Sequence, residues 1–499
     1  MRLKVGRQCC GNNVAAVISL KLILILFYLT LKEIEKLHTM EHRSRADKKI
    51  RQAHLNYPPL DWNLTNPPNS SCALFVSPEE VQYNNIYWQV QHTSNETYYF
   101  YGAYFDNRTQ SGIGPAIRIL GMSDRLLGQE RNIFCQLRFP GEIKPFFSQV
   151  SQFTYLWDVD WDFADLKLQP YLITCELPEG RSHLVPRSVS LVEHECDNAS
   201  NNLLVVHNPL PPGQKRKDFA VCVKGLYFYH QSMYAVRVAE YVELLKILGA
   251  DHVTIYRFQV HANISKVLDF YALTDVAVDV VDTTMPGPFA NIPDFMERYL
   301  KAHPRKQYVQ EVIHYNDCMY RQLDLFNYFV PIDIDEVIMP VSTDNWHDLV
   351  YKKAIPASQG QNVSAFVARN VLFADSEAPE HTDVIPWYMH MLQNVRRGRN
   401  FDPADYVGGL LHHKSFHDAQ KVLSLYNHSP RECFDKTCKV HVFDPEDAFL
   451  QHYCIGRTRP ECRNNNLTVD TTIWKFKNEL IRNTNRVLRR AGILGADNT

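Results

Sequence analysis

The chain has 499 residues, of which 45% are apolar and 22% charged, and its 53 Lys and Arg nearly balance its 55 Asp and Glu. This length predicts one large domain with appendages, or two domains, and the composition is that of an ordinary globular protein. The formal net charge of −2 lacks the basic excess of nucleic-acid-binding proteins, so we expect no nucleic-acid partner.

The N-terminal segment predicts a membrane anchor. Residues 14–31, VAAVISLKLILILFYLTL, are apolar except for Lys21 and as a helix would extend about 27 Å, close to the roughly 30 Å of a bilayer core. A cleaved signal peptide is the alternative, but the sequence at the end of this run, TLKEIEK, has no small-x-small cleavage site. We therefore expect an uncleaved signal-anchor, preceded by a cytosolic tail (1–13) and followed by a stem (32–70).

Glycosylation sequons and cysteines indicate on which side of the membrane the body of the chain lies. Basic residues flank the span on both sides, so the positive-inside rule gives about a tie. All nine N-x-S/T sequons lie downstream of the span, at Asn63, Asn69, Asn95, Asn107, Asn198, Asn263, Asn362, Asn427 and Asn466. Ten of the 12 Cys lie downstream too and none forms a CxxC pair, which favours disulfides over a zinc site. The prediction is a single-pass type II protein with a lumenal body.

Residues 71–210 predict a β-rich accessory region. Short aromatic-rich stretches such as NNIYWQVQHTS, ETYYFYGAYFD and PAIRILGMSD alternate with turn residues, as strands do. The segment NPLPPGQKRKD is rich in Pro, Gly and Lys and predicts a boundary after this region. The sequence assigns the region no role.

From residue 215 the pattern changes to alternating strands and helices. FAVCVKGLYF, HVTIYRF and AVDVVDTT predict strands, while YAVRVAEYVELLKILGA and ISKVLDFYAL have helical spacing, with Gly249 placed to end the first of these helices. The alternation predicts βαβ units and a mostly parallel sheet covered by helices. The last segment, 471–499, predicts an amphipathic C-terminal helix that docks on the protein rather than on a membrane.

The stretch YFVPIDIDEVIMP carries the strongest chemical signal. We expect a helix capped by Asn316 or Asp317, followed by the strand NYFVPI, which delivers Asp333 to the sheet edge where ligands bind in open α/β folds. Asp333 and Asp335 point to the same side of an extended chain, so their oxygens can converge on Mg²⁺ or Mn²⁺. Such a cation neutralises a leaving diphosphate.

Two other interpretations of this motif are alternatives to a diphosphate site. A solvated turn is disfavoured because buried apolar runs flank the carboxylates on both sides. A haloacid-dehalogenase-like phosphatase also places D-x-D after an apolar strand, with the first Asp as nucleophile. That motif opens its domain and needs a later paired-acid motif, whereas only Asp444 and Asp447 in FDPEDAF follow here, without the expected glycine.

Several segments appear in the order of glycosyltransferase family 92, which the chain resembles over residues 215–470. They are CVKGLYF, AEYVELLKILGADHVTIYRFQVHANISKVLDFY, NDCMYRQLDLFNYFVPIDIDEVIMP, HMLQNV, HHKSF, KVLSLYNHSP and LQHY. The resemblance implies a GT-A-like α/β domain in the Golgi membrane that uses a UDP-sugar, with UDP-galactose the expected donor, and Mn²⁺ or Mg²⁺. It implies inverting transfer to a glycan or glycolipid. The alternative is an inactive lumenal protein that uses this fold for binding or scaffolding, against which the intact Asp333 and Asp335 argue.

The resemblance also implies roles for individual residues around the carboxylates. Asp333 would contact the ribose or the metal, Asp335 would bind the metal and bridge to the diphosphate, and Glu336 would hold both in orientation. A C-terminal histidine would add a metal ligand, with His452 in LQHY the first choice and His428 in LYNHSP the second. Because His428 lies within a sequon, a glycan there would obstruct the metal site.

Further residues are expected around the donor. Lys414 in HHKSF is a candidate to pair with the diphosphate, although a solvated lysine is an equal alternative. Lys224 and Tyr227 on the first strand are candidates for the uridine pocket, with core packing the alternative for Tyr227. Cys222 and Cys318 match family positions, where disulfide bonding is the favoured role.

An inverting transfer needs a general base to deprotonate the acceptor hydroxyl. The polar loop LFADSEAPEHTD offers Asp375, Glu377 and Asp383. The sequence does not choose among the three, and exposed loop charge is the alternative for each.

Overall fold

The computed structural model describes residue 66 and residues 71–108, 114–126, 132–157, 167–375, 385–398, 413–435, 437–454 and 467–495. The chain divides into two compact units, Met1–His54 and Leu55–Thr499, and every described residue belongs to the second. The expected tail and anchor, and the stem apart from Asn66, therefore lie outside the described residues. Among the described helices none is long and apolar enough to span a bilayer.

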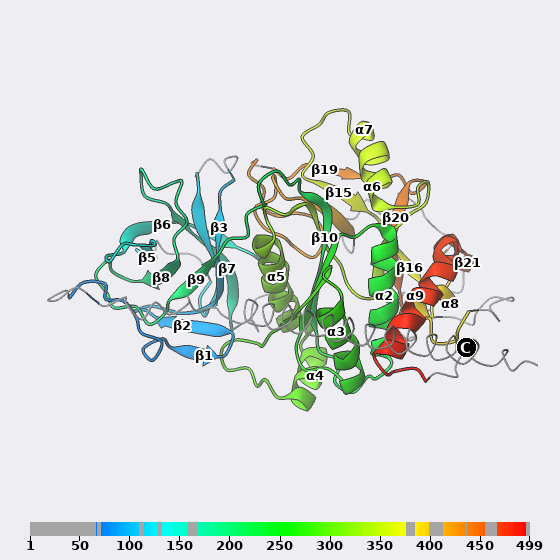
Figure 1. The fold of residues 1–499 in the computed structure, drawn as a ribbon, viewed down its shortest axis with the longest axis horizontal. Coiled ribbons are helices and arrows are strands. Elements are labelled where there is room, and N and C mark those ends of the chain that lie inside the picture. Colours follow the sequence, from blue (N-terminus) through cyan, green and yellow to red (C-terminus); the bar gives the residue numbers. More distant parts are fainter. Residues whose placement is uncertain are drawn as a thin grey trace, which may run out of the picture. The chain divides into compact units, whose positions relative to one another are not determined.

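The N-terminal part of the described chain is the expected β-rich region, whose nine-stranded sheet closes into a barrel (Figure 1). Closure comes from strand β3, which pairs with β4 on one side and with β9, at the far end of the sheet, on the other. Two disulfides, Cys72–Cys196 and Cys135–Cys175, lie within this region. In sheet order the strands are β1 (Tyr83–Asn85), β2 (Trp88–His92), β3 (Thr97–Asp106), β4 (Ala116–Ser123), β7 (Gln169–Glu176), β6 (Phe146–Tyr155), β5 (Phe134–Arg138), β8 (Ser188–Val192) and β9 (Leu203–Val206).

A seven-stranded sheet forms the centre of the α/β region. Its first four strands are parallel to their neighbours, as the βαβ pattern predicts, but β18 is antiparallel to both β13 and β15, so the sheet is mixed. In sheet order they are β12 (Val278–Asp282), β11 (His252–Arg257), β10 (Lys217–Leu226), β13 (Phe326–Pro331), β18 (Lys414–Asp418), β15 (Ala365–Ala368) and β19 (Val440–Val442).

A second, five-stranded sheet begins at the last residue of the DIDE motif, Glu336. Its first strand, β14, pairs antiparallel with β20 in a register that sets Glu336 opposite His452. In sheet order the strands are β14 (Glu336–Pro340), β20 (Ala448–Tyr453), β16 (Asn370–Phe373), β17 (Arg396–Gly398) and β21 (Leu467–Val469). The motif therefore joins the end of one sheet to the start of the next.

The helices follow the predicted apolar spacing. Helix α2 ends at Gly249, whose left-handed φ of 101° is the conformation that glycine adopts without penalty. The elements are α2 (Tyr234–Leu248), α3 (Ala262–Thr274), α4 (Pro293–Ala302), α5 (Pro304–Arg321), α6 (Trp346–Asp348), the π-helical turn η2 (Leu349–Ala354), α7 (Ile355–Ala357), α8 (His390–Gln393), the 3₁₀ turn η5 (Thr472–Phe476) and α9 (Lys477–Arg490).

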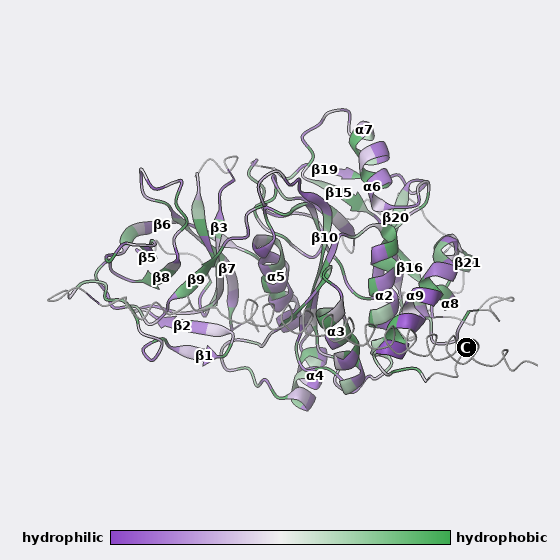
Figure 2. Cartoon of the chain, viewed as in Figure 1, coloured by the Kyte–Doolittle hydropathy of each residue, from purple (hydrophilic) through white to green (hydrophobic). Residues whose placement is uncertain are grey.

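The C-terminal helix α9 docks on the protein, as expected. It is mainly hydrophilic and lies beside α2 (Figure 2). Its buried residues are Leu480, Thr484, Val487 and Leu488, a spacing of three to four residues that places them on one face. The basic residues of this helix occupy the remaining surface.

The expected helix start before the DIDE motif is wrong. Helix α5 begins at Pro304 and already contains Asn316 and Asp317 near its C-terminal end. A proline in the first turn is compatible with a helix start because its missing N–H has no intrahelical acceptor there. Neither predicted cap residue caps the helix: the Asn316 amide donates to the carbonyls of Val312 and Leu425, and Asp317 pairs with Arg321.

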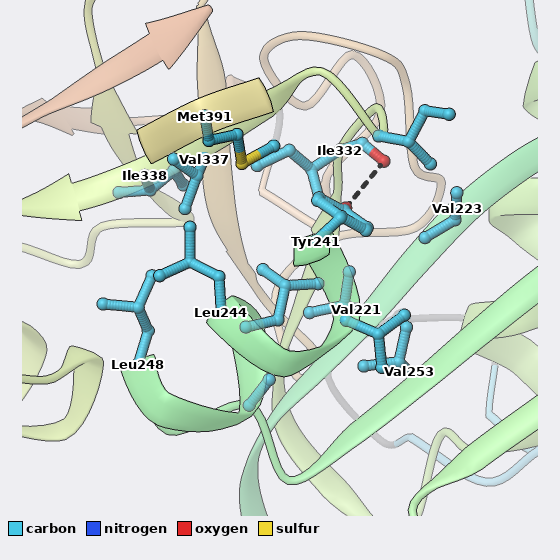
Figure 3. Close-up of a cluster of buried hydrophobic side chains, with 14 of the residues drawn as sticks. Val221, Val223, Tyr241, Leu244, Leu248, Val253, Ile332, Val337, Ile338 and Met391 are labelled. Carbon is cyan, nitrogen blue, oxygen red and sulfur yellow. Dashed lines mark hydrogen bonds between the residues drawn. The ribbon is translucent and has the colours of Figure 1, made fainter. Parts of the chain in front are cut away.

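The apolar core beneath the motif packs α2 against both sheets (Figure 3). Leu244 and Leu248 of α2 face Val337 and Ile338 of β14, and all four side chains are buried. The Tyr241 hydroxyl donates to the carbonyl of Ile332 at 3.4 Å. These contacts hold the backbone on either side of the carboxylates.

Candidate active site

The order of the central sheet reverses at β10. Strands β11 and β12 lie on one side of β10, and β13 lies on the other. In open α/β sheets such a switch point forms a crevice at the carboxyl ends of the strands. Lys224, near the end of β10, and Asp333, two residues beyond β13, meet there with their Nζ and Oδ2 atoms 3.1 Å apart.

Strand β10 has a local irregularity at Lys224. Its pairing with β11 shifts register between Val223 and Leu226, and such bulges re-aim side chains. A Cβ at Gly225 would collide with the rings of Phe258 and His314. Glycine therefore permits the close approach that this segment needs.

Asp333 is held by two ammonium groups and a tyrosine. Its Oδ2 lies 3.1 Å from Lys224 Nζ and 3.4 Å from Lys414 Nζ, and the Tyr315 hydroxyl donates to its Oδ1 at 3.4 Å. Burial alone would raise the pKa of this carboxyl, but Lys224 and then Lys414 hold the pKa well below its usual range. Asp333 is therefore a compensated, ionised carboxylate.

Lys414 is fully buried and its three N–H donors each have an acceptor. Its Nζ lies 3.0 Å from Glu336 Oε2 and 3.4 Å from Asp333 Oδ2, and it donates to the Asn427 side-chain oxygen. An ammonium group has three donors. This lysine thus holds protein carboxylates. The Lys224 side chain, 20% exposed, contacts Asp333 and Glu311 at 3.1 and 2.8 Å, which leaves one of its three donors without an acceptor among the described residues.

Three residues of the site were not predicted from the sequence. Glu311 and Tyr315 lie one turn apart on α5, and Asn427 donates to Glu311 Oε2 at 3.4 Å and accepts from Lys414. The i,i+4 spacing of Glu311 and Tyr315 was the available signal, but it is also typical of an ordinary helix surface. Asn427 was considered only as a sequon.

Asp335 and His452 face each other on the open side of the motif. His452 Nε2 lies 3.7 Å from Asp335 Oδ2, and its Nδ1 lies 3.4 Å from Glu336 Oε1. Burial, followed by the neighbouring carboxylates Glu336 and Asp333, raises the pKa of Asp335, against the opposing effect of His452. Asp335 lacks the lysine contacts that compensate Asp333.

The charges of this cluster do not balance. Four carboxylates, those of Glu311, Asp333, Asp335 and Glu336, stand against the two ammonium groups of Lys224 and Lys414. Among these six groups, two negative charges remain, the charge of one divalent cation. Within the described ranges, no three His, Cys, Asp or Glu side chains are already arranged as a metal site. Asp335 and His452 nevertheless offer the oxygen and nitrogen donors that Mn²⁺ accepts.

Two further predicted site residues are Tyr227 and His428. Tyr227 donates to Gln307 Oε1 at 2.8 Å, and Gln307 in turn donates to Glu311, so Tyr227 borders the site. The ring of His428 pairs through Nδ1 with the carbonyl of His413 at 3.0 Å. His428 thus lies next to Asn427, and its imidazole points to a backbone carbonyl.

The three base candidates are only partly described. Asp375 follows β16, whose last residue pairs with Tyr453 beside His452, so it leaves the sheet on the side of that histidine. Glu377 and Asp383 lie outside the described residues.

Disulfides are present, as predicted. Besides the two in the barrel, Cys222–Cys318 joins β10 to α5 and Cys433–Cys438 closes a short loop. Cys454 is also disulfide-bonded. Multiple disulfides are typical of proteins of the secretory pathway.

A mixed α/β sheet with carboxylates and lysines at its switch point is typical of α/β proteins that bind a ligand at this edge of the sheet. Residues 217–486 match the model of glycosyltransferase family 92, which is more than half of the chain. The chain therefore belongs to glycosyltransferase family 92, and the predicted resemblance is confirmed. The match extends into α9, beyond the expected limit at residue 470.

A comparison with solved structures adds little. The chain is similar to core-mannan synthase A from Aspergillus fumigatus in its Mn/GDP form, at 12% sequence identity and a TM-score of 0.18. The match covers 34% of this chain and 47%, about half, of that chain. A likeness this low carries no argument about function. No sequence among the curated proteins matches.

Proposed function

We propose that this protein transfers galactose from UDP-galactose, with inversion, to a glycan or glycolipid acceptor in the Golgi lumen. Family membership supports sugar transfer, while the choice of galactose, inversion and the Golgi rests on the resemblance to family 92. The observation that carries the proposal is the meeting of Asp333, Asp335 and Lys224 at the switch point of the sheet.

Different residues of the site would bind different parts of the donor. Asp333, held by two lysines, would contact the ribose or the metal, and Lys224 would donate to a phosphate oxygen. Asp335 and His452 would hold a divalent cation, which fits the two uncompensated negative charges of the cluster. When bound, that cation supplies charge neutralisation to the leaving diphosphate. Glu336, paired with Lys414 at 3.0 Å, fixes the orientation of the motif.

The general base on the acceptor side stays a proposal among Asp375, Glu377 and Asp383. Asp375 is favoured because it leaves β16 on the side of His452. Its carboxylate would accept the proton of the acceptor hydroxyl as the new glycosidic bond forms.

The test is turnover of UDP-galactose by the purified full chain, with Mn²⁺ and after its removal by EDTA. We expect activity that needs the cation, and Asp335→Asn should lower kcat/KM by about 100-fold or more. The same variant should not lower the thermal midpoint, because the contact of Asp335 Oδ2 with His452 Nε2 is long, at 3.7 Å, and because burial and the neighbouring carboxylates raise the pKa of Asp335. Absence of turnover with every nucleotide sugar would instead support a binding or scaffolding protein.

A further inference from the structure

Several buried polar atoms around the candidate site have no hydrogen-bond partner in the described structure, and three of them belong to neighbouring segments. They are Arg237 Nη1, Glu240 Oε2 and His390 Nε2. Glu240 is 0% exposed. A buried polar group without a partner is costly, so such atoms indicate something that the protein binds.

The three side chains come from segments that lie against each other. Arg237 and Glu240 lie three residues apart on α2 and so share a face of the helix. Glu240 Oε1 accepts from the backbone N–H groups of Met391 and Leu392, at 3.0 and 3.2 Å, which sets this carboxylate against the start of α8. His390 is the residue at that start.

These segments lie next to the DIDE motif. The ring centroid of His390 is 6.2 Å from that of Tyr453, and the Tyr453 N–H donates to the Asp335 carbonyl at 2.7 Å. On α2, Arg237 stacks over the ring of Tyr234 with its Cζ 4.8 Å from the centroid. Residue Tyr241, beside Glu240, bonds the backbone just before Asp333.

The donor or acceptor character of the three atoms indicates the chemical class of the ligand. The Asn394 amide donates to His390 Nδ1 at 3.0 Å, so Nε2 of the neutral ring carries the proton and is a donor. Arg237 Nη1 is also a donor, while Glu240 Oε2 accepts a hydrogen bond when the carboxyl is ionised and donates one when it is protonated. A hydroxyl group both donates and accepts, and therefore suits the set.

We propose that Arg237, Glu240 and His390 bind hydroxyl groups of the sugar that the donor carries. This inference rests on the proposed function, because it assigns a sugar subsite beside the proposed diphosphate site. Neighbouring hydroxyls of a hexose match one carboxylate flanked by two donors. These residues select the sugar, and Asp333 and Asp335 bind the part of the donor common to all nucleotide sugars.

The test compares the affinities of UDP and UDP-galactose by calorimetry, in Mn²⁺ at pH 8, where the carboxyl of Glu240 is ionised, for the full-length wild type and Glu240→Gln. Glutamine keeps an oxygen for the backbone N–H groups of α8 but turns the free acceptor into a donor. We expect the wild type to bind UDP-galactose about tenfold or more tightly than UDP. The variant should lose that difference while its affinity for UDP stays unchanged.

Monodeoxy analogues of UDP-galactose locate the hydroxyl. One analogue should bind equally to the wild type and to Glu240→Gln, because the hydroxyl that Glu240 accepts is missing. The matched control is Glu243→Gln, since Glu243 is also buried on α2 but accepts from Tyr271 at 3.0 Å, away from the motif. This control should leave the preference for UDP-galactose intact.

Two outcomes overturn the inference. Equal losses for UDP and UDP-galactose would show a structural effect, and an unchanged preference would show that the three atoms bind only an internal water. Failure of the proposed function is a separate result, because binding is measured without turnover: a chain that binds UDP-galactose through Glu240 but transfers nothing would refute the transfer alone.

Discussion

At the scale of single residues, the two lysines that the sequence predicts around the donor, Lys224 and Lys414, differ in their surroundings. Lys414 is fully buried, with Asp333, Glu336 and Asn427 as acceptors. The Lys224 side chain is 20% exposed and holds only two carboxylates. We therefore propose that the first is a structural counter-ion for the motif and that the second meets the ligand.

Replacing each lysine by methionine should separate these roles. Removing one partner of a buried ion pair leaves an uncompensated charge, so Lys414→Met should lower the free energy of unfolding by about 3–5 kcal/mol. Lys224→Met should cost less stability, because that side chain reaches solvent, and should chiefly weaken UDP binding. Chemical denaturation and calorimetry measure the two effects. Equal losses of stability would contradict the distinction.

The sequon at Asn427 should carry no glycan in the active protein. Its side-chain nitrogen, the atom to which a glycan is attached, donates to Glu311, and its oxygen accepts from Lys414. The sequon residues Asn95 and Asn198 are exposed and should be glycosylated. Glycopeptide mass spectrometry of the purified chain measures occupancy at each site. A glycan at Asn427 in catalytically active molecules would refute the arrangement of this side chain.

At the scale of secondary-structure elements, the packing of α2 against α8 depends on a buried carboxyl. Burial raises the pKa of Glu240 to about 7, although the backbone N–H groups of α8 partly oppose this effect. Between the ordinary pKa of 4.5 and 7, the folded state therefore keeps a proton that the unfolded state has lost. Stability from this group is present below pH 4.5 and is lost as the pH rises through 7.

A comparison with Glu240→Gln isolates this titration. At about 1.4 kcal/mol per pKa unit, the wild type should lose about 3 kcal/mol of unfolding free energy relative to the variant between pH 4.5 and 7.5. Denaturant melts at several pH values measure the difference. Glu243→Gln provides the reference for a buried helix carboxyl with a different environment. Parallel pH profiles for wild type and Glu240→Gln would show that this carboxyl is already ionised at pH 4.5.

At the scale of the whole molecule, the barrel and the α/β region share one core. A single buried cluster contains Trp88, Tyr104 and Leu172 of the barrel together with Val312 and Met319 of α5. Tyr104 and Tyr256 both donate to the buried carboxylate of Asp317. The same helix presents Glu311 and Tyr315 to the candidate site, so the barrel supports a wall of that site.

This arrangement predicts a single cooperative unfolding transition for the barrel and the α/β region. Tyr104→Phe removes a donor from a buried carboxylate and should lower the free energy of unfolding by about 1.5–3 kcal/mol, shifting the whole transition. Tyr83→Phe, at an exposed tyrosine of the same barrel, should change it by less than about 0.5 kcal/mol. Intrinsic fluorescence and circular dichroism follow the melts. Two separate transitions, of which only one moves, would show independent domains.

The sequence by itself determined the local features of this protein. The positions of α2, α3 and the parallel strands follow from apolar spacing, and the end of α2 follows from Gly249, because these signals act over a few residues. Asp333 and Asp335 were predictable as a candidate pair since both lie directly after a strand. The start of α5 was misjudged because polar residues of that helix are buried by contacts with distant segments.

The tertiary structure decided which side chains meet. Separate elements contribute Glu311, Asp333, Lys414 and Asn427. Their ion pairs and hydrogen bonds form only once the sheet order brings β10, β13 and β18 together. The same holds for Arg237, Glu240 and His390, whose unpartnered atoms are defined by burial. Residue type and spacing carry chemistry that is local, whereas burial and pairing depend on segments far apart in the chain.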